Sequence, residues 1–212
     1  MNWLGMAYIC LGVLGLLLVS EAGWRMGWLR NEFGRKFVHI TVGTFVAFWP
    51  YIVGWTEVIV LSLAFFFGVI IAFRLGLFRA VSTYQRPTYG EVLFALSVGL
   101  LAVLTNSKGI YAAAILQMAL ADGFAAVIGK WLGKSTQYEV IGKTKSIVGT
   151  LTFFIISITI LIGYSHVSDN GLAWQYILLG SIGATALENL VSYGFDNLAV
   201  PITIGLMLQI VA

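Results

Sequence analysis

Charged residues are scarce in this 212-residue chain: they make up only 10% of the residues, whereas 59% are hydrophobic. The mean hydropathy is correspondingly high, at +0.93. A soluble globular domain typically carries about 25% charged residues, so this composition excludes that class of protein. Twelve bases and nine acids leave a net charge of +3, and the bases fall into a few clusters separated by apolar runs. Because they do not form one basic face, nucleic-acid binding has little support.

Cysteine is nearly absent as well. The single cysteine, Cys10, lies inside the first apolar run of the chain. One cysteine can form neither an intramolecular disulfide nor a cysteine zinc site, and we expect it to be a small core residue. The sequence also lacks internal repeats, low-complexity tracts and polar linkers. We therefore expect a single transmembrane catalytic domain over residues 1–212.

Long apolar runs dominate what is present. About 18 uncharged residues are enough to cross the hydrocarbon core of a membrane. We interpret all such runs as helices, because main-chain polar groups in lipid must be satisfied within the segment and the runs lack the alternation of barrel strands. The predicted fold class is an all-α integral membrane protein, a bundle of about eight transmembrane helices. The expected segments are residues 3–20, 37–56, 58–73, 92–107, 110–128, 147–165, 170–187 and 197–212.

The positions of lysine and arginine predict the orientation, because these residues accumulate in cytoplasmic loops. Eleven of the twelve bases lie in the connections after the first, third and fifth segments, which include Arg30, Arg79 and Arg86. Only Lys108 lies on the opposite side. We therefore predict a multi-pass protein with both termini outside and its active site on the cytoplasmic face.

One acid falls inside a predicted membrane segment. Asp122 lies about seven residues before the end of the fifth segment, roughly 10 Å inside the membrane boundary at 1.5 Å per residue. A carboxylate at that depth is costly and marks a functional-site hypothesis with a nearby cationic partner. The alternative is a structural ion pair with a loop lysine. Four further acids, Glu91, Glu139, Glu188 and Asp196, map to the same end of the predicted bundle.

The connection between the fifth and sixth segments is rich in lysine and glycine. It contains the triplets GKS at 133–135 and GKT at 142–144. A P-loop requires a glycine five positions before the second one, and those positions hold Ile128 and Gln137, so this motif is excluded. The lysines could still neutralise phosphates, and Ser146 precedes a helix whose N-terminal amides could hold an anion. An ordinary basic loop that orients the protein and attracts anionic lipid is the alternative.

The turn between the last two segments adds carboxylates to the same face. Glu188 lies near one helix end, and Asp196 and Asn197 lie at the start of the next. Asp196 alone is equally typical of a helix N-cap. Taken together with Asp122 and the lysine-rich loop, however, these residues form a site suited to Mg²⁺ and a polyphosphate. Carboxylate oxygens are ligands for a hard cation, and lysines neutralise the remaining negative charge.

Residues 122–150 resemble the nucleotide-binding signature of the phytol kinase and dolichol kinase family. Three further stretches agree with that family in order: RKFVH at 35–39, TYGEVLF around Glu91, and Glu188 followed by DNLAVP at 196–201. Val148 departs from the pattern, which usually carries glutamate at this position. The matching residues of the signature are Asp122, Ala125, Ala126, Gly129, Gly133, Lys134, Lys143, Lys145, Ser146, Gly149 and Thr150.

The resemblance implies a membrane kinase that transfers the terminal phosphate of a nucleotide to an isoprenoid alcohol such as phytol, geranylgeraniol, farnesol or a polyprenol. CTP is the donor implied, with another NTP left open. The partners implied are the lipid-soluble alcohol, the nucleotide and membrane lipids, but no nucleic acid; a homo-oligomer is left open. Mg²⁺ is implied on Asp122, Asp196 and Glu188, and the catalytic set comprises these three residues with Lys145 and His39.

The resemblance also implies which residues bind the two substrates. His39 is equally consistent with an interface-anchored helix start, and Glu91 with a favourable interaction at a helix N-terminus. The residue that accepts the proton of the alcohol is left open. The residues implied to bind the nucleotide are Gly129, Gly133, Lys134, Lys143, Lys145, Ser146, Gly149 and Thr150. Those implied to bind the alcohol are Arg35, Lys36, His39, Glu91 and Asn197.

Two other functions fit parts of the sequence. A CTP-dependent cytidylyltransferase that makes a CDP-lipid would use a similar membrane site, but the chain lacks the longer acidic and basic C-terminal signature of that family. A small ion-coupled transporter would use Asp122 as its proton or cation site. A transporter has no need of the lysine-rich loop, which therefore favours the kinase.

Overall fold

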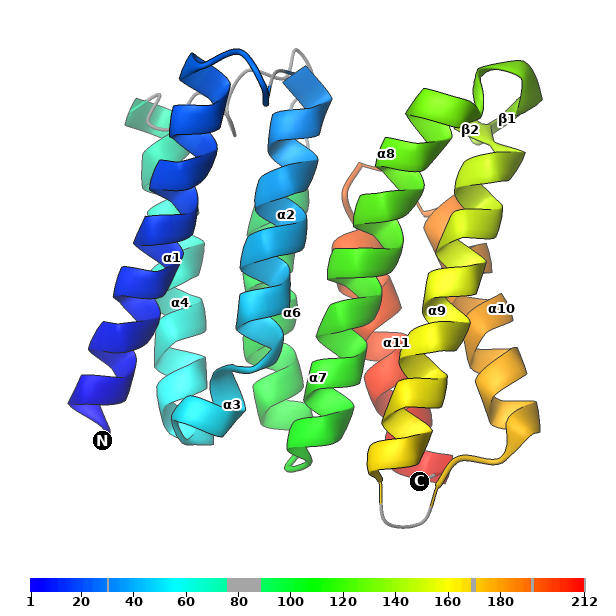
Figure 1. The fold of residues 1–212 in the computed structure, drawn as a ribbon. Coiled ribbons are helices and arrows are strands. Elements are labelled where there is room, and N and C mark those ends of the chain that lie inside the picture. Colours follow the sequence, from blue (N-terminus) through cyan, green and yellow to red (C-terminus); the bar gives the residue numbers. More distant parts are fainter. Residues whose placement is uncertain (30, 76–88, 169–170, 192, 212) are drawn as a thin grey trace.

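The computed structural model describes residues 1–29, 31–75, 89–168, 171–191 and 193–211, and nearly all of them are helical (Figure 1). A single two-stranded hairpin is the only sheet in these ranges. The elements are α1 (Trp3–Arg25), α2 (Asn31–Ala47), α3 (Trp49–Ile52), α4 (Trp55–Leu75), α6 (Gly90–Leu104), α7 (Lys108–Leu116), the π turn η1 (Gln117–Asp122), α8 (Gly123–Leu132), the 3₁₀ turn η2 (Lys134–Thr136), β1 (Gln137–Val140), β2 (Lys143–Ser146), α9 (Ile147–Val167), α10 (Trp174–Leu190) and α11 (Asp196–Val211).

Seven of the eight predicted segments each overlap one continuous helical run, the exception is 37–56, and the predicted all-α membrane fold is confirmed. The helices run alternately up and down, so that both termini lie at one end and the hairpin at the other (Figure 1). Lys108 begins α7 at the end that carries the termini, where its ammonium lies 5.5 Å from the centre of the Tyr51 ring. Arg30, Arg79, Arg86 and the predicted segment ends at 170 and 212 lie outside the described residues.

Four of the helices are long and apolar enough to cross a membrane: Trp3–Arg25, Trp55–Ala72, Lys108–Leu132 and Ile147–Val167. The others are shorter, and a 17-residue helix such as α10 is only about 25 Å long at 1.5 Å per residue. The predicted segment 37–56 is not one helix. Helix α2 ends at Ala47, and the short α3 begins at Trp49 with Pro50 in its first turn. Proline has no amide hydrogen to continue a helix, but it fits a first helical turn.

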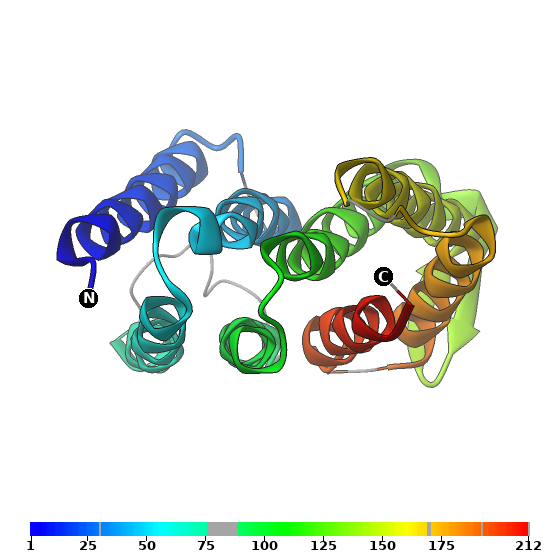
Figure 2. The same ribbon diagram turned by 90° about the horizontal axis from the view of Figure 1, so that it is seen from below.

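The central element of the bundle is the continuous run of α7, η1 and α8. In an 18-residue apolar stretch of this segment 61% of the residues are buried, against 11 to 22% in the corresponding stretches of the other three long helices. Seen along the helix axes, it contacts α2 on one side and α9 and α11 on the other (Figure 2). Tyr111 and Met118 on this segment are almost fully buried. Asp122, the acid inside a predicted membrane segment, therefore lies on the most buried of the four long helices.

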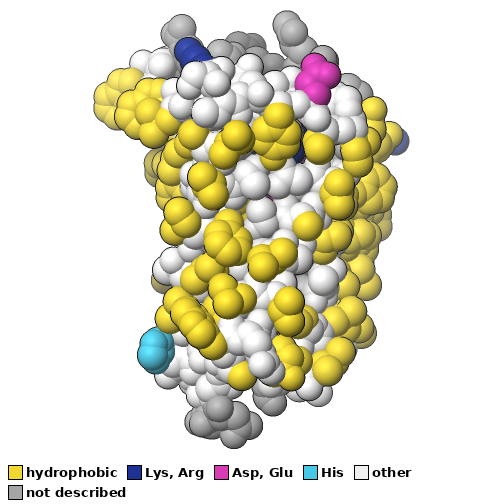
Figure 3. All heavy atoms as spheres, turned by 90° about the vertical axis from the view of Figure 1, so that its right-hand side faces the viewer, with side chains coloured by type: hydrophobic (Ala, Val, Ile, Leu, Met, Phe, Trp, Pro, Cys, Tyr) yellow, Lys and Arg dark blue, Asp and Glu magenta, His cyan; other side chains and the backbone are white. Residues whose placement is uncertain are grey.

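The outer surface is apolar over most of its height. On the face turned to the viewer in Figure 3, hydrophobic side chains are spread over most of the height between backbone and other side chains, and the charged side chains are seen towards the hairpin end. Large side chains such as Ile155 and Leu179 are more than half exposed. This distribution suits helices in contact with lipid chains. Cys10 also points outward from α1, so the expectation of a core cysteine is wrong: lipid-facing positions accept small apolar side chains as readily as the core does.

The hairpin formed by β1 and β2 was not predicted from the sequence. Its strands pair antiparallel, with Tyr138 opposite Lys145, and they turn at Ile141 and Gly142. Both turn residues have positive φ, +46° and +69°, as a type I′ turn requires. The sequence signal for this turn is usually Asn-Gly or Asp-Gly. This chain has Ile-Gly at these positions, so the turn could not be predicted from that signal. The lysine-rich connection is thus an ordered element that fixes the direction of its side chains.

Candidate active site at the hairpin end of the bundle

The centre of the candidate site is a buried ion pair between α2 and the central segment. Lys36 Nζ lies 2.5 Å from Asp122 Oδ2, and both side chains are almost fully enclosed, with exposures of 7% and 11%. The two residues are 86 positions apart in the chain, and the antiparallel packing of α2 against η1 and α8 brings them together. A cationic partner for Asp122 was predicted from its depth in the membrane segment; that partner, Lys36, comes from α2 and not from the lysine-rich loop.

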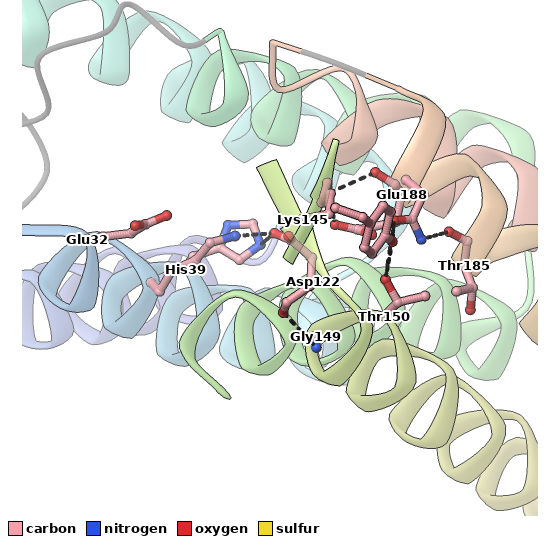
Figure 4. A network of polar contacts seen from close by, with 12 residues as sticks. Glu32, His39, Asp122, Lys145, Gly149, Thr150, Thr185 and Glu188 are labelled. Atoms are coloured by element: carbon pink, nitrogen blue, oxygen red, sulfur yellow. Dashed lines mark hydrogen bonds and ion pairs between the residues drawn. The ribbon is translucent and has the colours of Figure 1, made fainter. Parts of the chain in front are cut away.

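His39 completes this cluster from the next turn of α2. Its Nε2 lies 3.3 Å from Asp122 Oδ2 and 3.0 Å from the main-chain oxygen of Met118 (Figure 4). A main-chain oxygen can only accept a hydrogen bond, and so can the oxygen of an ionised carboxylate. Nε2 is therefore the nitrogen that carries the hydrogen. Met118 and Asp122 both belong to the π turn, a feature that often occurs at functional sites.

A second buried ion pair joins the hairpin to the end of α10. Lys145 Nζ donates to a carboxylate oxygen of Glu188, and also to its main-chain oxygen at 3.1 Å. Burial lowers the pKa of Lys145, but the charge and the hydrogen bond of Glu188, together with the charges of Asp122 and Asp196, outweigh this effect. The pKa of Lys145 is therefore raised, and the side chain stays protonated at neutral pH. Of the three carboxylates, Glu188 contacts the ammonium group directly, and Asp122 and Asp196 act on it through their charges.

Lys143 and Lys134 differ from Lys145 in their surroundings. Burial lowers the pKa of Lys143, and the nearby charge of Asp196 offsets only part of this effect. Lys134 is exposed in η2, at the start of the hairpin segment. The predicted phosphate-binding lysines therefore range from an enclosed position to the surface, and Lys145 is the one brought into the cluster of carboxylates.

Asp196 and Asn197 begin α11 close to the start of α6. Asn197 Nδ2 donates to the main-chain oxygen of Gly90 at 3.0 Å, which ties the two helices together. Asp196 Oδ1 and Asn197 Oδ1 are buried and lack a hydrogen-bond partner among the described residues. A buried oxygen without a partner is costly, and a bound cation or donor is one way to satisfy it. Asp196 is therefore the predicted metal ligand with an acceptor atom still available.

The predicted nucleotide-binding glycines have a packing role. A Cβ atom on Gly129 would lie 2.8 Å from Ser146 Oγ and 3.0 Å from the Cα of Gly149, so α8 and α9 could not approach as closely. Ser146 precedes α9, as predicted, and is its N-cap: its hydroxyl oxygen accepts from the amide of Gly149 at 3.1 Å. Packing alone thus explains the small residues at Gly129 and Gly149, and their contact with a nucleotide stays a prediction.

Arg35 and Glu91 lie at the edge of the site and take part in weaker ion pairs. Arg35 lies 3.8 Å from a Glu91 oxygen and 3.9 Å from a Glu32 oxygen. Glu32 also pairs with Lys130 at 2.8 Å, which links α2 to α8. Glu91 lies in the first turn of α6, where a negative charge is favourable. Glu32 was missed in the sequence because nothing in its spacing relates it to Lys130.

A hydrogen-bonded group next to Lys145 was also missed. The Tyr138 hydroxyl lies 2.6 Å from Thr150 Oγ1 and 2.5 Å from Asn189 Oδ1. Among these residues only Thr150 was a predicted site residue. Tyrosine and asparagine in loops and at helix ends carry no pattern that marks them out, so only the structure identifies the group.

The three predicted magnesium ligands do not form a ready-made cage. In the described ranges, no group of three His, Cys, Asp or Glu side chains is close enough to hold a metal ion. Asp122 contacts Lys36, and Glu188 contacts Lys145. The metal assignment therefore stays a prediction, and ligation by Asp122 or Glu188 would require the carboxylate to exchange its ammonium partner for the ion.

The fold and the site together define a class: an all-α membrane protein whose buried carboxylates and lysines meet at one end of the bundle. Comparison with known proteins gives the family. The chain is 33% identical over 206 residues to a phytol kinase of Synechocystis sp. The aligned region covers 93% of this chain and 86% of that relative. It is 25% identical over 224 residues to a probable chloroplastic phytol kinase 2 of Oryza sativa subsp. japonica, covering 94% of this chain and 73% of the relative.

The chain therefore belongs to the phytol kinase family, and it is a phosphotransferase with an alcohol acceptor. The resemblance noted in the sequence is confirmed at the level of the family. No protein-family model and no solved structure matches the chain.

Proposed function

We propose that this protein is an integral membrane kinase that transfers the terminal phosphate of a nucleotide, CTP in the first instance, to the hydroxyl of an isoprenoid alcohol such as phytol. The observation that carries the proposal is the convergence of Asp122, Lys36 and His39 with Lys145 and Glu188 at the end of the bundle that bears the lysine-rich hairpin. The names of the two relatives support phytol as the acceptor.

The hairpin supplies the charges for the nucleotide. We assign Lys134, Lys143 and Lys145 to its phosphates, with Lys145 nearest to the transferred group. Phosphoryl transfer depends mainly on positioning and on neutralising the charge of the phosphoryl oxygens. The raised pKa of Lys145 supports this role, because a lysine that stays protonated keeps its full positive charge. Gly133, Ser146 and Thr150 would contact the nucleotide through main-chain or hydroxyl groups.

A divalent ion fits the carboxylates of this site in part. Carboxylate oxygens are the ligands that Mg²⁺ prefers, and the buried Oδ1 of Asp196 has no competing partner among the described residues. We assign Mg²⁺ to Asp196, Asp122 and Glu188. When bound, the ion would neutralise charge on the nucleotide phosphates. Lys36 holds the Asp122 carboxylate in place, and Lys145 holds that of Glu188.

The acceptor alcohol would reach the site from the lipid. A shallow groove between α2 and α8 leads to Lys36, and apolar side chains form part of its wall: Phe33, Ala126 and Val127. The ion pair of Glu32 and Lys130 lies at the same groove. Such a surface suits an apolar chain with a single polar end. Arg35, Glu91 and Asn197 would line the region around the hydroxyl.

The reaction needs a group that takes the proton of the alcohol. The alcohol oxygen would attack the terminal phosphorus, the bond from that phosphorus to its bridging oxygen would break, and the nucleoside diphosphate would leave with the electron pair. The hydroxyl proton would pass to His39 or Asp122. In neutral His39, Nδ1 is the nitrogen with a lone pair, since Nε2 donates towards Met118 and Asp122.

The test uses purified protein with Mg²⁺, each NTP labelled in its terminal phosphate, and a panel of prenols of different lengths. We expect label in the prenyl monophosphate, with CTP as the best donor. The products also separate the kinase from a cytidylyltransferase: a kinase releases a nucleoside diphosphate, whereas a cytidylyltransferase releases pyrophosphate and leaves the nucleotide on the lipid. Absence of labelled prenyl phosphate with every donor, from protein shown to be folded, would contradict the proposal.

The sidedness of the reaction is a second prediction. We propose that both termini are outside and that the hairpin end faces the cytoplasm, since eleven of twelve bases map to that side. A nucleotide with several negative charges cannot cross the hydrocarbon core. Sealed vesicles with the cytoplasmic face outward should therefore phosphorylate a prenol in the bilayer when NTP and Mg²⁺ are added.

Vesicles of the opposite orientation should be inactive until detergent opens them. Labelling of single cysteines introduced at positions 108 and 134, in a variant without Cys10, reports the orientation independently. Equal activity of both vesicle types without detergent would contradict the proposed topology.

A further inference from the structure

The hairpin is attached to α10 at two adjacent points. Tyr138 and Lys145 are partners across the two strands, so their side chains lie on one face of the hairpin. They contact consecutive residues at the end of α10: Lys145 contacts Glu188, and Tyr138 contacts Asn189. The position of the Lys145 ammonium therefore depends on the neighbouring contact as well as on its own.

The hydrogens of this second contact can be assigned by elimination. Asn189 Nδ2 donates to the main-chain oxygen of Thr185 at 2.9 Å, so Asn189 Oδ1 faces the hairpin as an acceptor. The Tyr138 hydroxyl therefore donates to Asn189 Oδ1, at 2.5 Å. Its oxygen can then accept from Thr150 Oγ1, at 2.6 Å, and Thr150 Oγ1 also lies 3.3 Å from Asn189 Oδ1, to which it can donate instead. The result is a triangle of hydrogen bonds that joins α9, the hairpin and α10, and hydrogen bonds in such a network strengthen one another.

We propose that Tyr138 and Asn189 are positioning residues for the nucleotide: they hold the hairpin so that Lys145 stays against Glu188 at the end of α10. This inference rests on the proposed role of Lys145 at the phosphates. Neither residue needs to touch the reacting atoms. Their effect is to keep the hairpin in one position against the end of α10, where the nucleotide would find its lysine already in place.

The test compares three variants with the wild type: Tyr138→Phe, Asn189→Leu and the double variant. Losing a hydrogen bond of ordinary strength corresponds to about a fivefold change in an equilibrium constant. We expect the KM for the nucleotide to rise about fivefold in each single variant, with less than a twofold change in the KM for the prenol. The nucleotide KM of the double variant should be no higher than that of the more impaired single variant, because both substitutions break the same hydrogen bond.

A matched control is Tyr89→Phe, which removes an exposed hydroxyl at the same end of the bundle and should leave both KM values unchanged. Hydrogen exchange of residues 137–146, measured without substrates, should become faster in Tyr138→Phe but not in Tyr89→Phe. An unchanged nucleotide KM in folded Tyr138→Phe, or equal losses for both substrates, would overturn the inference. The two proposals fail differently: an inactive wild type contradicts the kinase, whereas an active wild type with unaffected variants contradicts only the positioning role.

Discussion

Asp122→Asn is expected to reduce kinase activity below about one hundredth of the wild-type rate while the protein stays folded in the membrane. Asparagine keeps an oxygen that can accept from Lys36, 2.5 Å away in the native site, but it loses the negative charge that a metal ion or an alcohol proton requires. Activity with a prenol and NTP, together with thermal stability in detergent, measures both effects.

Two further variants make this result specific. Asp122→Asn leaves the buried Lys36 without a counter-charge, which is destabilising, so Lys36→Met combined with Asp122→Asn tests whether removing that charge restores stability without restoring activity. Glu57→Gln is the matched control, since Glu57 is a buried carboxylate at the opposite end that accepts from the amide of Asn2. A folded Asp122→Asn protein that retains more than about a tenth of the rate, roughly 1.4 kcal/mol of barrier, would exclude a catalytic or metal-binding role.

Lys145→Ala should have the second largest effect, raising the nucleotide KM or lowering kcat by about tenfold or more. Against the effect of burial, the charge and the hydrogen bond of Glu188 contribute most to raising the pKa of Lys145, so the ammonium keeps its charge in the site. Lys108→Ala removes the same side chain at the other end of the bundle and should change neither parameter. Steady-state kinetics with the nucleotide as the varied substrate compares the two.

The loss in Lys145→Ala could also arise from instability, because Glu188 would remain buried without its partner. The double variant Lys145→Ala, Glu188→Gln separates the two causes. We expect it to regain thermal stability but not nucleotide affinity. Similar kinetics for Lys145→Ala and Lys108→Ala would mean that the basic connection only orients the protein in the membrane.

Single residues show how far the sequence predicts this structure. Asp122 stands out because a charge within an apolar run is costly and needs a reason, and the structure places it in a buried cluster. Its partner could not be identified, because Lys36 lies 86 positions away and only the packing of α2 on the central segment joins them. The break between α2 and α3 depends on a single proline, which charge spacing does not reveal.

The hairpin shows a different limit. Four-residue strands are too short for a periodic signal, and their turn uses Ile141 in a conformation that asparagine or glycine normally marks. Tyr138 and Asn189 become noticeable only after the hairpin is placed on α10. The membrane segments were predictable from one-dimensional composition, whereas the contacts within the site depend on long-range packing.

The π turn in the central segment has one more consequence. A turn closed by i to i+5 hydrogen bonds takes up one residue more than an α-helical turn, so everything beyond it is rotated by roughly 100°, the angle of one residue. The turn occupies Gln117–Asp122. The face of α8 that carries Gly129 towards α9 is therefore out of phase with the buried face of α7. One continuous helical segment thus has two faces that point in different directions: that of α7 packs in the core, and that of α8 packs on α9 near the hairpin end. No loop separates them.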